Sequence, residues 1–273
     1  MKHLKSLDIS KIIDGSKNSL TLLWKSIFKE KIMQIIITHP TFDYLWQEIQ
    51  SNNPKQVRLW KVDFKRFSDG TPNLFIHNVK EDIEHQEVTY IWDFSRDEDL
   101  FMQIALMRGI IDYNASKLRI IAPYFHTGTM ERIQKKGEIA TAKYLADEFS
   151  GIPSGRSGKN SLHTFDIHAL QERFFFDSQR VNAELHTAMS LIKEKITKDT
   201  VIVFPDEGAQ KRFWLDFEWY EIIVCSKVRD GDKRKVTIKE GNPKGKKVII
   251  IDDLIQSGGT IRETVELLKS WGA

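Results

Sequence analysis

The chain has 273 residues, of which 41% are hydrophobic and 29% are charged, as expected for a globular protein of one or two domains. The formal net charge of +3 is too small to indicate nucleic acid or a membrane surface as a partner. The single cysteine, Cys225, excludes an internal disulfide framework, and no apolar run is long enough to span a membrane. These features favour a reducing compartment, and we expect a cytoplasmic protein.

Residues 1–31 differ in composition from the rest of the chain. They carry seven lysines and three acidic residues, and five apolar residues between positions 20 and 28 could form one face of a helix. The absence of arginine argues against a transit peptide. We therefore predict a packed or partner-binding N-terminal extension.

Residues 32–155 alternate between strand-like and helix-like segments. Strands are expected at 34–38, 57–64, 74–77, 88–94 and 118–122, and helices at 42–49, 100–110 and 138–149. Such alternation predicts an α/β domain built on a parallel sheet.

The segment 150–161 is rich in glycine, serine and proline and is the best candidate for a linker. The alternation then restarts, with strands expected at 162–167, 201–204, 221–225 and 248–251, a helix at 183–195 and a helix at the end of the chain. We therefore predict a second α/β domain, residues 156–273, beginning after a boundary near residue 155.

The end of the chain has the pattern of an anion-binding βα unit. The aliphatic strand 248–251 is followed by two aspartates, by a loop with two glycines at 258–259 and by a helix, for which Thr260 and Glu263 have capping-box spacing. Glycines allow backbone N–H groups to turn toward a ligand, and a helix N-terminus favours phosphate. Carboxylates suit sugar hydroxyls or hydrated Mg²⁺. The segment predicts a site for a phosphorylated ribose; the alternative is an ordinary βα unit with a tight turn.

The motif Asp-Asp-Leu-Ile-Gln-Ser-Gly-Gly-Thr at 252–260 resembles the PRPP-binding motif of type I phosphoribosyltransferases and of ribose-phosphate diphosphokinases, or PRPP synthetases. Four further segments favour the synthetases, namely Phe67-Ser-Asp-Gly-Thr-Pro, Thr164-Phe-Asp-Ile-His, Pro205-Asp-Glu-Gly-Ala and Lys227-Val-Arg. The resemblance covers residues 33–273 and is closest to the plant-type, class II branch, on the segments 123–132, 168–174 and 227–234.

This resemblance implies an α/β fold of two phosphoribosyltransferase-like (Rossmann-like) domains with mainly parallel sheets. It also implies Mg²⁺-dependent transfer of the diphosphoryl group of ATP, or of another nucleoside triphosphate, to the C1 hydroxyl of ribose 5-phosphate, which yields PRPP and AMP. The family continues past its phosphate loop through further strands, so the C-terminal domain is expected to be incomplete at residue 273. A catalytically silent regulatory subunit and a PRPP-consuming phosphoribosyltransferase are the alternatives.

The resemblance also assigns roles to individual residues. Lys227 and Arg229 would be the catalytic pair, on a flexible loop. The ribose 5-phosphate site would comprise Asp252, Asp253, Gln256, Ser257, Gly258, Gly259 and Thr260. The nucleotide site would comprise Phe67, Asp69, Thr71, Thr129, Met130, Arg132 and His168. The Mg²⁺ ligands would come from Asp166, His168, Asp177 and Asp206.

Several of these residues also have a simpler structural interpretation. Phe67 could be a buried ring beside a turn, the charges after Lys227 could be an exposed basic loop, and Asp206 could form an Asx-type turn. Because the loop of Phe67 and Asp69 usually serves a neighbouring subunit in this family, a homo-oligomer is expected. Thr71, Thr129, Met130 and Gln256 depart from the class I pattern, which leaves the donor nucleotide open.

Overall fold

The computed structural model describes residues 34–42, 51, 57–93, 97–230 and 233–273. The chain divides into two compact units, the first ending at His186 and the second beginning at Thr187. The division therefore does not lie near residue 155, where the sequence placed it. Residues 160–186 belong to the first unit because they form two strands that hydrogen-bond onto its sheet.

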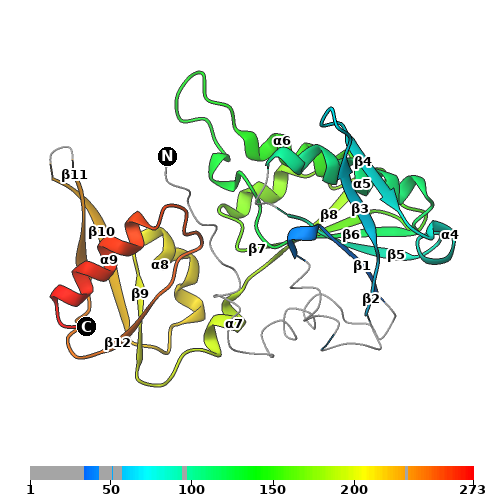
Figure 1. Ribbon diagram of the computed structural model, residues 1–273. Coiled ribbons are helices and arrows are strands. Elements are labelled where there is room, and N and C mark those ends of the chain that lie inside the picture. Colours follow the sequence, from blue (N-terminus) through cyan, green and yellow to red (C-terminus); the bar gives the residue numbers. More distant parts are fainter. Residues whose placement is uncertain (1–33, 43–50, 52–56, 94–96, 231–232) are drawn as a thin grey trace. The chain divides into compact units, whose positions relative to one another are not determined.

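The first unit contains a six-stranded sheet in which every neighbouring pair of strands is parallel (Figure 1). In spatial order its strands are β2 (Val57–Leu59), β1 (Gln34–Thr38), β5 (Glu87–Ile91), β6 (Lys117–Ala122), β7 (Asn160–Phe165) and β8 (Val181–His186). The other elements in the described part of this unit are the hairpin β3 (Val62–Arg66) and β4 (Pro72–Ile76), the helices α4 (Val79–Asp82), α5 (Leu100–Asp112) and α6 (Thr141–Ser150), and the 3-10 helices η1 (Pro40–Phe42), η2 (Asp97–Asp99), η3 (Gly128–Met130) and η4 (Leu170–Phe175).

One face of this sheet packs against α5 and α6. Alternate residues of β1, β5, β6 and β7, among them Ile37, Tyr90 and Ile120, join residues such as Met107 of α5 and Phe149 of α6 in one buried cluster. The other face of the strands is also largely buried, which explains why they are nearly continuous aliphatic runs. The mainly parallel α/β fold expected from the sequence is confirmed.

The second unit is built on a four-stranded mixed sheet. Its spatial order is β11 (Lys233–Glu240), β10 (Ile222–Asp230), β9 (Thr200–Phe204) and β12 (Lys247–Ile250), and only the β10–β11 pair is antiparallel. Its helices are α7 (Met189–Lys193), α8 (Glu207–Phe213), η5 (Trp214–Asp216) and α9 (Gly259–Ser270). Two buried clusters cover the two faces of the sheet.

Cys225 lies on β10 in one of these buried clusters, together with Val203 and Leu268. Burial raises the pKa of its thiol to about 11, so the thiol is protonated at neutral pH. Cys225 is therefore a small core residue. None of the helices in the described part of the chain is long and apolar enough to cross a membrane.

The prediction of a helix at 183–195 is wrong for the first half of that range. Val181–His186 is the edge strand β8, and helix α7 begins only at Met189. Val181 and Ala183 face the core while Asn182 is exposed, which is the period-two pattern of a strand. Alanine, glutamate and leucine are good helix formers, so propensity concealed that pattern.

The segment expected to be a linker is instead a packed turn. Gly155 lies against the start of β6, where an added Cβ atom would sit only 2.2 Å from the carbonyl oxygen of Ser116. The N–H of Ser157 donates to the same carbonyl at 2.8 Å. Because both contacts are to backbone, they cannot be relieved by moving a side chain.

Gly155→Ala should therefore lower the free energy of unfolding by about 1–3 kcal/mol, the usual cost of overpacking. Gly109→Ala is the matched control, since Gly109 lies inside α5 with open space around it, and we expect it to raise stability by up to about 1 kcal/mol. Urea unfolding of both variants measures the difference. Equal effects of the two substitutions would contradict the packed turn.

Candidate functional site

Three carboxylates lie at one edge of the second unit's sheet. Asp206 follows β9, and Asp252 and Asp253 follow β12. β9 and β12 are parallel neighbours with Val203 opposite Ile250, so their carboxyl ends lie side by side. The carboxyl edge of a parallel sheet is where α/β proteins bind ligands.

Local hydrogen bonds orient these carboxylates. Asp206 is the N-cap of α8, and its Oδ1 accepts the N–H of Ala209 at 3.0 Å, which agrees with the turn-forming interpretation of this residue. Asp252 Oδ1 accepts the N–H of Asp253 at 3.0 Å. Arg212, from α8, places Nη1 3.8 Å from Asp253 Oδ2. The edge therefore carries three acids and one nearby guanidinium.

These surroundings change the pKa of the Asp252 carboxyl. Burial, assisted by the hydrogen bond to Asp253 and the charges of Asp253 and Asp206, raises the pKa of Asp252 to about 7. A site that disfavours a further negative charge in this way is one that a cation would stabilise.

The loop after β12, residues 251–258, leads directly into α9 and is called here the glycine loop. The helix begins at Gly259 rather than at Thr260, and its N-cap is Gly258 with φ 72°, a left-handed conformation that favours glycine. The capping box expected from Thr260 and Glu263 is therefore not formed. Gly258 offers no side chain as a cap, so the first N–H groups of α9 after that of Gly259 are left to be satisfied by solvent or by an anion.

The other loop residues lie around this turn. Gln256 and Ser257 are exposed, and Thr260 is half-buried, with its carbonyl accepting the Thr264 hydroxyl at 2.8 Å. Ser257 Oγ accepts the N–H of Gly259 at 3.4 Å. The structure thus brings all seven residues assigned to the ribose 5-phosphate site into one strand–loop–helix unit.

Lys227 and Arg229 do not lie on a flexible loop. They occupy strand positions in β10, where Lys227 pairs with Val236 and Arg229 with Arg234 of the antiparallel strand β11. The sequence placed the end of this strand at Cys225 and missed β11. A two-stranded ribbon with many charged positions lacks the continuous apolar run that marks a buried strand.

In the first unit, the turn of Thr129 and Met130 lies against the segment of His168. Gly128 is buried, and an added Cβ would sit 3.6 Å from His168 Cβ and 3.3 Å from Glu172 Oε2. Glu172 Oε1 in turn accepts the N–H of Ala169 at 2.8 Å, which holds the His168 segment in place. His168 is exposed and Met130 is 38% exposed, so both remain accessible.

The structure separates two of the assigned metal ligands. Asp166 follows the carboxyl end of β7, has φ 43° and donates its N–H to the His186 carbonyl at 2.9 Å. Asp177 precedes β8 and lies beyond the amino-terminal ends of the same parallel pair, where Asn160 pairs with Val181. Its Oδ1 accepts the N–H of Gln179 at 2.8 Å in a surface turn. Asp177 is therefore wrong as a ligand shared with Asp166 and His168.

The turn of the β3–β4 hairpin carries Phe67, Asp69 and Thr71. Phe67 donates its N–H to the Thr71 carbonyl at 2.9 Å, but its ring is 56% exposed, so the interpretation as a buried ring is wrong. Asp69 Oδ1 accepts the N–H of Thr71 at 2.9 Å, which lowers the pKa of the Asp69 carboxyl. This turn presents an exposed aromatic face beside an ionised acceptor. Arg132 is also exposed, with Nε 3.2 Å from Glu131 Oε1.

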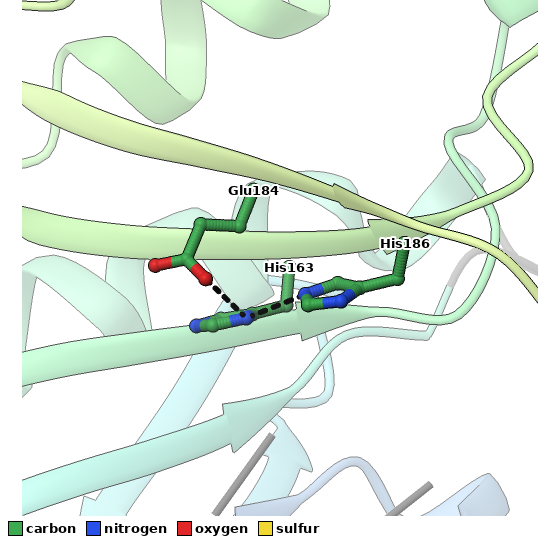
Figure 2. A group of neighbouring side chains, drawn as sticks. All are labelled: His163, Glu184 and His186. Atoms are coloured by element: carbon green, nitrogen blue, oxygen red, sulfur yellow. Dashed lines mark hydrogen bonds and ion pairs between the residues drawn. The ribbon is translucent and has the colours of Figure 1, made fainter. Parts of the chain in front are cut away.

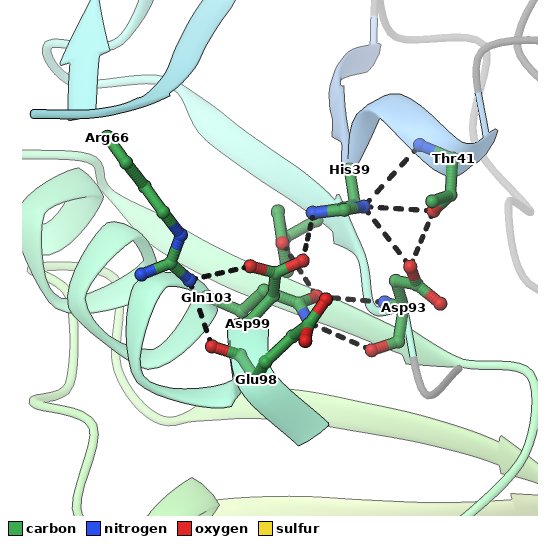
Figure 3. A network of polar contacts seen from close by, with 8 residues as sticks. His39, Thr41, Arg66, Asp93, Glu98, Asp99 and Gln103 are labelled. Atoms are coloured by element: carbon green, nitrogen blue, oxygen red, sulfur yellow. Dashed lines mark hydrogen bonds and ion pairs between the residues drawn. The ribbon is translucent and has the colours of Figure 1, made fainter. Parts of the chain in front are cut away.

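A polar network that the sequence did not indicate anchors this hairpin (Figure 3). Arg66 donates from Nη2 to Asp99 Oδ1 at 2.8 Å and from Nη1 to the Gly70 carbonyl at 3.0 Å. Asp99 Oδ2 lies 3.6 Å from His39 Nε2, and Asp93 Oδ2 lies 3.1 Å from His39 Nδ1.

His39 and Asp93 each come soon after a buried strand, β1 and β5, and these adjacent strands are where the strand order reverses. Polar residues just beyond two aliphatic runs were the available signal, but the adjacency of the two strands was not readable from the sequence. The network connects this reversal point to the exposed turn.

The raised pKa of Asp252 has a consequence for stability. The folded state holds this proton more tightly than the unfolded chain between pH 3.8 and about 7, so the contribution of Asp252 to stability falls as the pH rises through that range. Relative to the parent, Asp252→Asn should therefore gain stability between about pH 5 and about pH 8, as measured by urea unfolding. Asp199→Asn, an exposed control in the same unit, should show no such trend. A stability difference for Asp252→Asn that is independent of pH would contradict the assignment.

Comparison with known proteins places these features in a family. The sequence model of the phosphoribosyl transferase domain matches residues 217–273, which include β10, the glycine loop and α9. A solved structure, a phosphoribosylpyrophosphate synthetase from Mycobacterium smegmatis, superposes with a TM-score of 0.67 at 21% identity, covering 89% of this chain and 78% of that one. This similarity shows the fold.

Curated relatives are more similar in sequence. The chain is 42% identical to ribose-phosphate pyrophosphokinase 3, chloroplastic, of Arabidopsis thaliana, over 80% of this chain and 54% of that protein. It is 40% identical to ribose-phosphate pyrophosphokinase 4 of Oryza sativa over 80% and 68% respectively, and 33% identical to the enzyme of Methanobrevibacter smithii over 78% and 74%. The chain thus spans about half to two thirds of the length of its plant relatives. On this similarity, the chain belongs to the ribose-phosphate pyrophosphokinase family.

Proposed function

We propose that the protein transfers the diphosphoryl group of ATP, or of another nucleoside triphosphate, to the C1 hydroxyl of ribose 5-phosphate, which yields PRPP and AMP for nucleotide biosynthesis. The observation that carries the proposal is the carboxyl edge of β9 and β12, where Asp206, Asp252 and Asp253 adjoin the glycine loop before α9. The family membership of the chain supports the same activity.

The acceptor fits this edge by its chemistry. The 5-phosphate would lie on the loop from Gln256 to Thr260, where backbone N–H groups at the start of α9 are available to an anion. Asp252 and Asp253 would accept hydrogen bonds from the ribose hydroxyls. The left-handed Gly258 keeps the loop tight, and a side chain at this position would strain it.

Mg²⁺ is the cofactor that suits the available ligands. Magnesium binds through carboxylates and substrate phosphates. Burial, together with the neighbouring carboxylates, raises the pKa of Asp252, and a divalent cation would relieve this cost of holding a negative charge. In the second unit Asp206 would be the Mg²⁺ ligand, and Asp166 and His168 are the candidate Mg²⁺ ligands of the first unit. When bound, Mg²⁺ would neutralise charge on the diphosphoryl group.

The donor nucleotide would bind through the first unit. Phe67 offers an exposed ring for stacking on the base, and Asp69 an ionised acceptor for its amino group. Thr71, Thr129, Met130, Arg132 and His168 would contact the rest of the nucleotide. We also propose that the chain forms a homo-oligomer in which this turn serves a neighbouring subunit, and that it is cytoplasmic.

The reaction requires positive charge at the transferred group. The C1 hydroxyl oxygen forms a bond to the β-phosphorus, the bond from that phosphorus to the oxygen of the α-phosphate breaks, and the hydroxyl proton is released to solvent. The side chains of Lys227 and Arg229 would bind the diphosphoryl oxygens, whose charge is spread in the transition state.

Lys227→Ala should therefore lower kcat for AMP formation by about 100-fold to 1,000-fold. AMP and PRPP are measured after incubation of the purified protein with Mg²⁺, ATP and ribose 5-phosphate. Lys198→Ala, an exposed lysine in the same unit, is the matched control and should retain full activity. If a well-folded parent forms no AMP alone but raises the activity of an added relative, it is a regulatory subunit and the proposal fails.

Phe67→Ala should raise the KM for ATP about tenfold, because loss of one stacking contact costs about 1–3 kcal/mol, while the KM for ribose 5-phosphate stays constant. Phe75→Ala is a closely matched control, since Phe75 is 58% exposed on β4 of the same hairpin. Steady-state kinetics with each substrate varied in turn distinguish the two variants. The same KM for ATP in both would remove Phe67 from the nucleotide site.

A further inference from the structure

Three potential metal ligands meet on one face of the ladder between β7 and β8. His163 comes from β7, and Glu184 and His186 come from β8, two positions apart on the same face (Figure 2). His163 pairs directly with Glu184, and Phe165 with His186. One nitrogen from each imidazole and one carboxylate oxygen all lie within 4.8 Å of one another.

The distances are close to those of a coordination sphere. His163 Nδ1 lies 2.9 Å from His186 Nε2 and 3.7 Å from Glu184 Oε2. In a tetrahedral zinc site with bonds of about 2.1 Å, neighbouring ligand atoms are about 3.4 Å apart. The three atoms are therefore placed so that small side-chain rotations admit an ion between them.

The atoms that face away from this centre are held by further hydrogen bonds. His163 Nε2 lies 3.1 Å from Ser161 Oγ, and Asn182 Nδ2 donates to Glu184 Oε1 at 3.0 Å. The ring of His186 stacks on Phe165 with centroids 5.2 Å apart. Such outer contacts fix the tautomer of a ligating histidine and the orientation of a ligating carboxylate.

The protonation state and the exposure of the cluster also suit a metal ion. Burial lowers the pKa of His163 to about 3, with further lowering by the charges of His186, Arg119 and Lys117, so its imidazole is neutral at physiological pH. A neutral imidazole needs to lose no proton before it binds a metal. The Glu184 side chain is 43% exposed, which leaves a path to solvent.

We propose that His163, Glu184 and His186 bind one Zn²⁺ ion, with a fourth coordination position open to solvent. Two imidazole nitrogens and one carboxylate favour a zinc-type ion, whereas Mg²⁺ is held mainly by carboxylates, phosphates and water. This site shares no residue with the proposed Mg²⁺ site and does not depend on the catalytic activity. β8 is the edge strand of its sheet, and the ion would fasten it to β7. It would also stabilise the His186 backbone, whose carbonyl accepts the N–H of Asp166.

The test is a zinc titration of the full chain, stripped of metal and free of Mg²⁺ and nucleotide, in competition with a chromophoric chelator. We expect one tight equivalent in the parent. Ser161→Ala removes only an outer contact and should lower the affinity for zinc about 10–100-fold. Glu184→Gln and His186→Gln remove a ligand and should lower the affinity further. His85→Asn and Glu84→Gln are the matched controls, since exposed His85 and half-buried Glu84 form a His–Glu pair at 3.8 Å.

Thermal unfolding with and without Zn²⁺ separates a loss of zinc binding from a folding defect in the variants. Zn²⁺ should raise the midpoint of thermal unfolding of the parent and of both control variants, but not of Glu184→Gln or His186→Gln. Co²⁺, used as a spectroscopic probe, should give visible absorption bands in the parent that both ligand variants lose. The proposal is overturned if the parent takes up no zinc, or if folded Glu184→Gln and His186→Gln bind zinc as tightly as the parent.

Discussion

Parallel pairing between adjacent strands is the constraint from which the candidate sites follow. When strands run in one direction, their carboxyl ends come to one edge, and whatever the sequence places just after each strand is gathered there. In the second unit this brings Asp206 beside Asp252 and Asp253. In the first unit it brings His39 near Asp93 and places Asp166 on the edge opposite to Asp177. The chemistry of both units depends on strand direction more than on distance along the chain.

Much of the fold was predictable because buried parallel strands have a strong sequence signal. β1 and β9 are aliphatic runs in which every residue is buried, and each was predicted to within one residue. The failures occur where a strand is exposed. β8 exposes Asn182 between two core residues, and the charged strand β11 ends in the exposed Lys239 and Glu240, so neither is a continuous aliphatic run. Their residue composition resembles that of a helix or a loop.

The candidate site was predictable where it is local in sequence. The strand, loop and helix that hold Ser257 and Gly258 are contiguous, and only the helix start was misplaced, by one residue. The partners of Arg66 could not be predicted, because Asp99 and His39 meet only through the pairing of β1 with β5. The pairing of His163 with Glu184 likewise requires the register of β7 and β8, which no short motif encodes.

The buried thiol of Cys225 offers a way to measure how often the sheet of the second unit opens. It is the only cysteine in the chain, it is fully buried against both flanking strands and α9, and its pKa of about 11 keeps it in the unreactive thiol form. A thiol reagent can reach it only when the sheet opens. The rate of alkylation therefore counts opening events directly, and its change on addition of a ligand converts into the free energy by which that ligand holds the sheet closed.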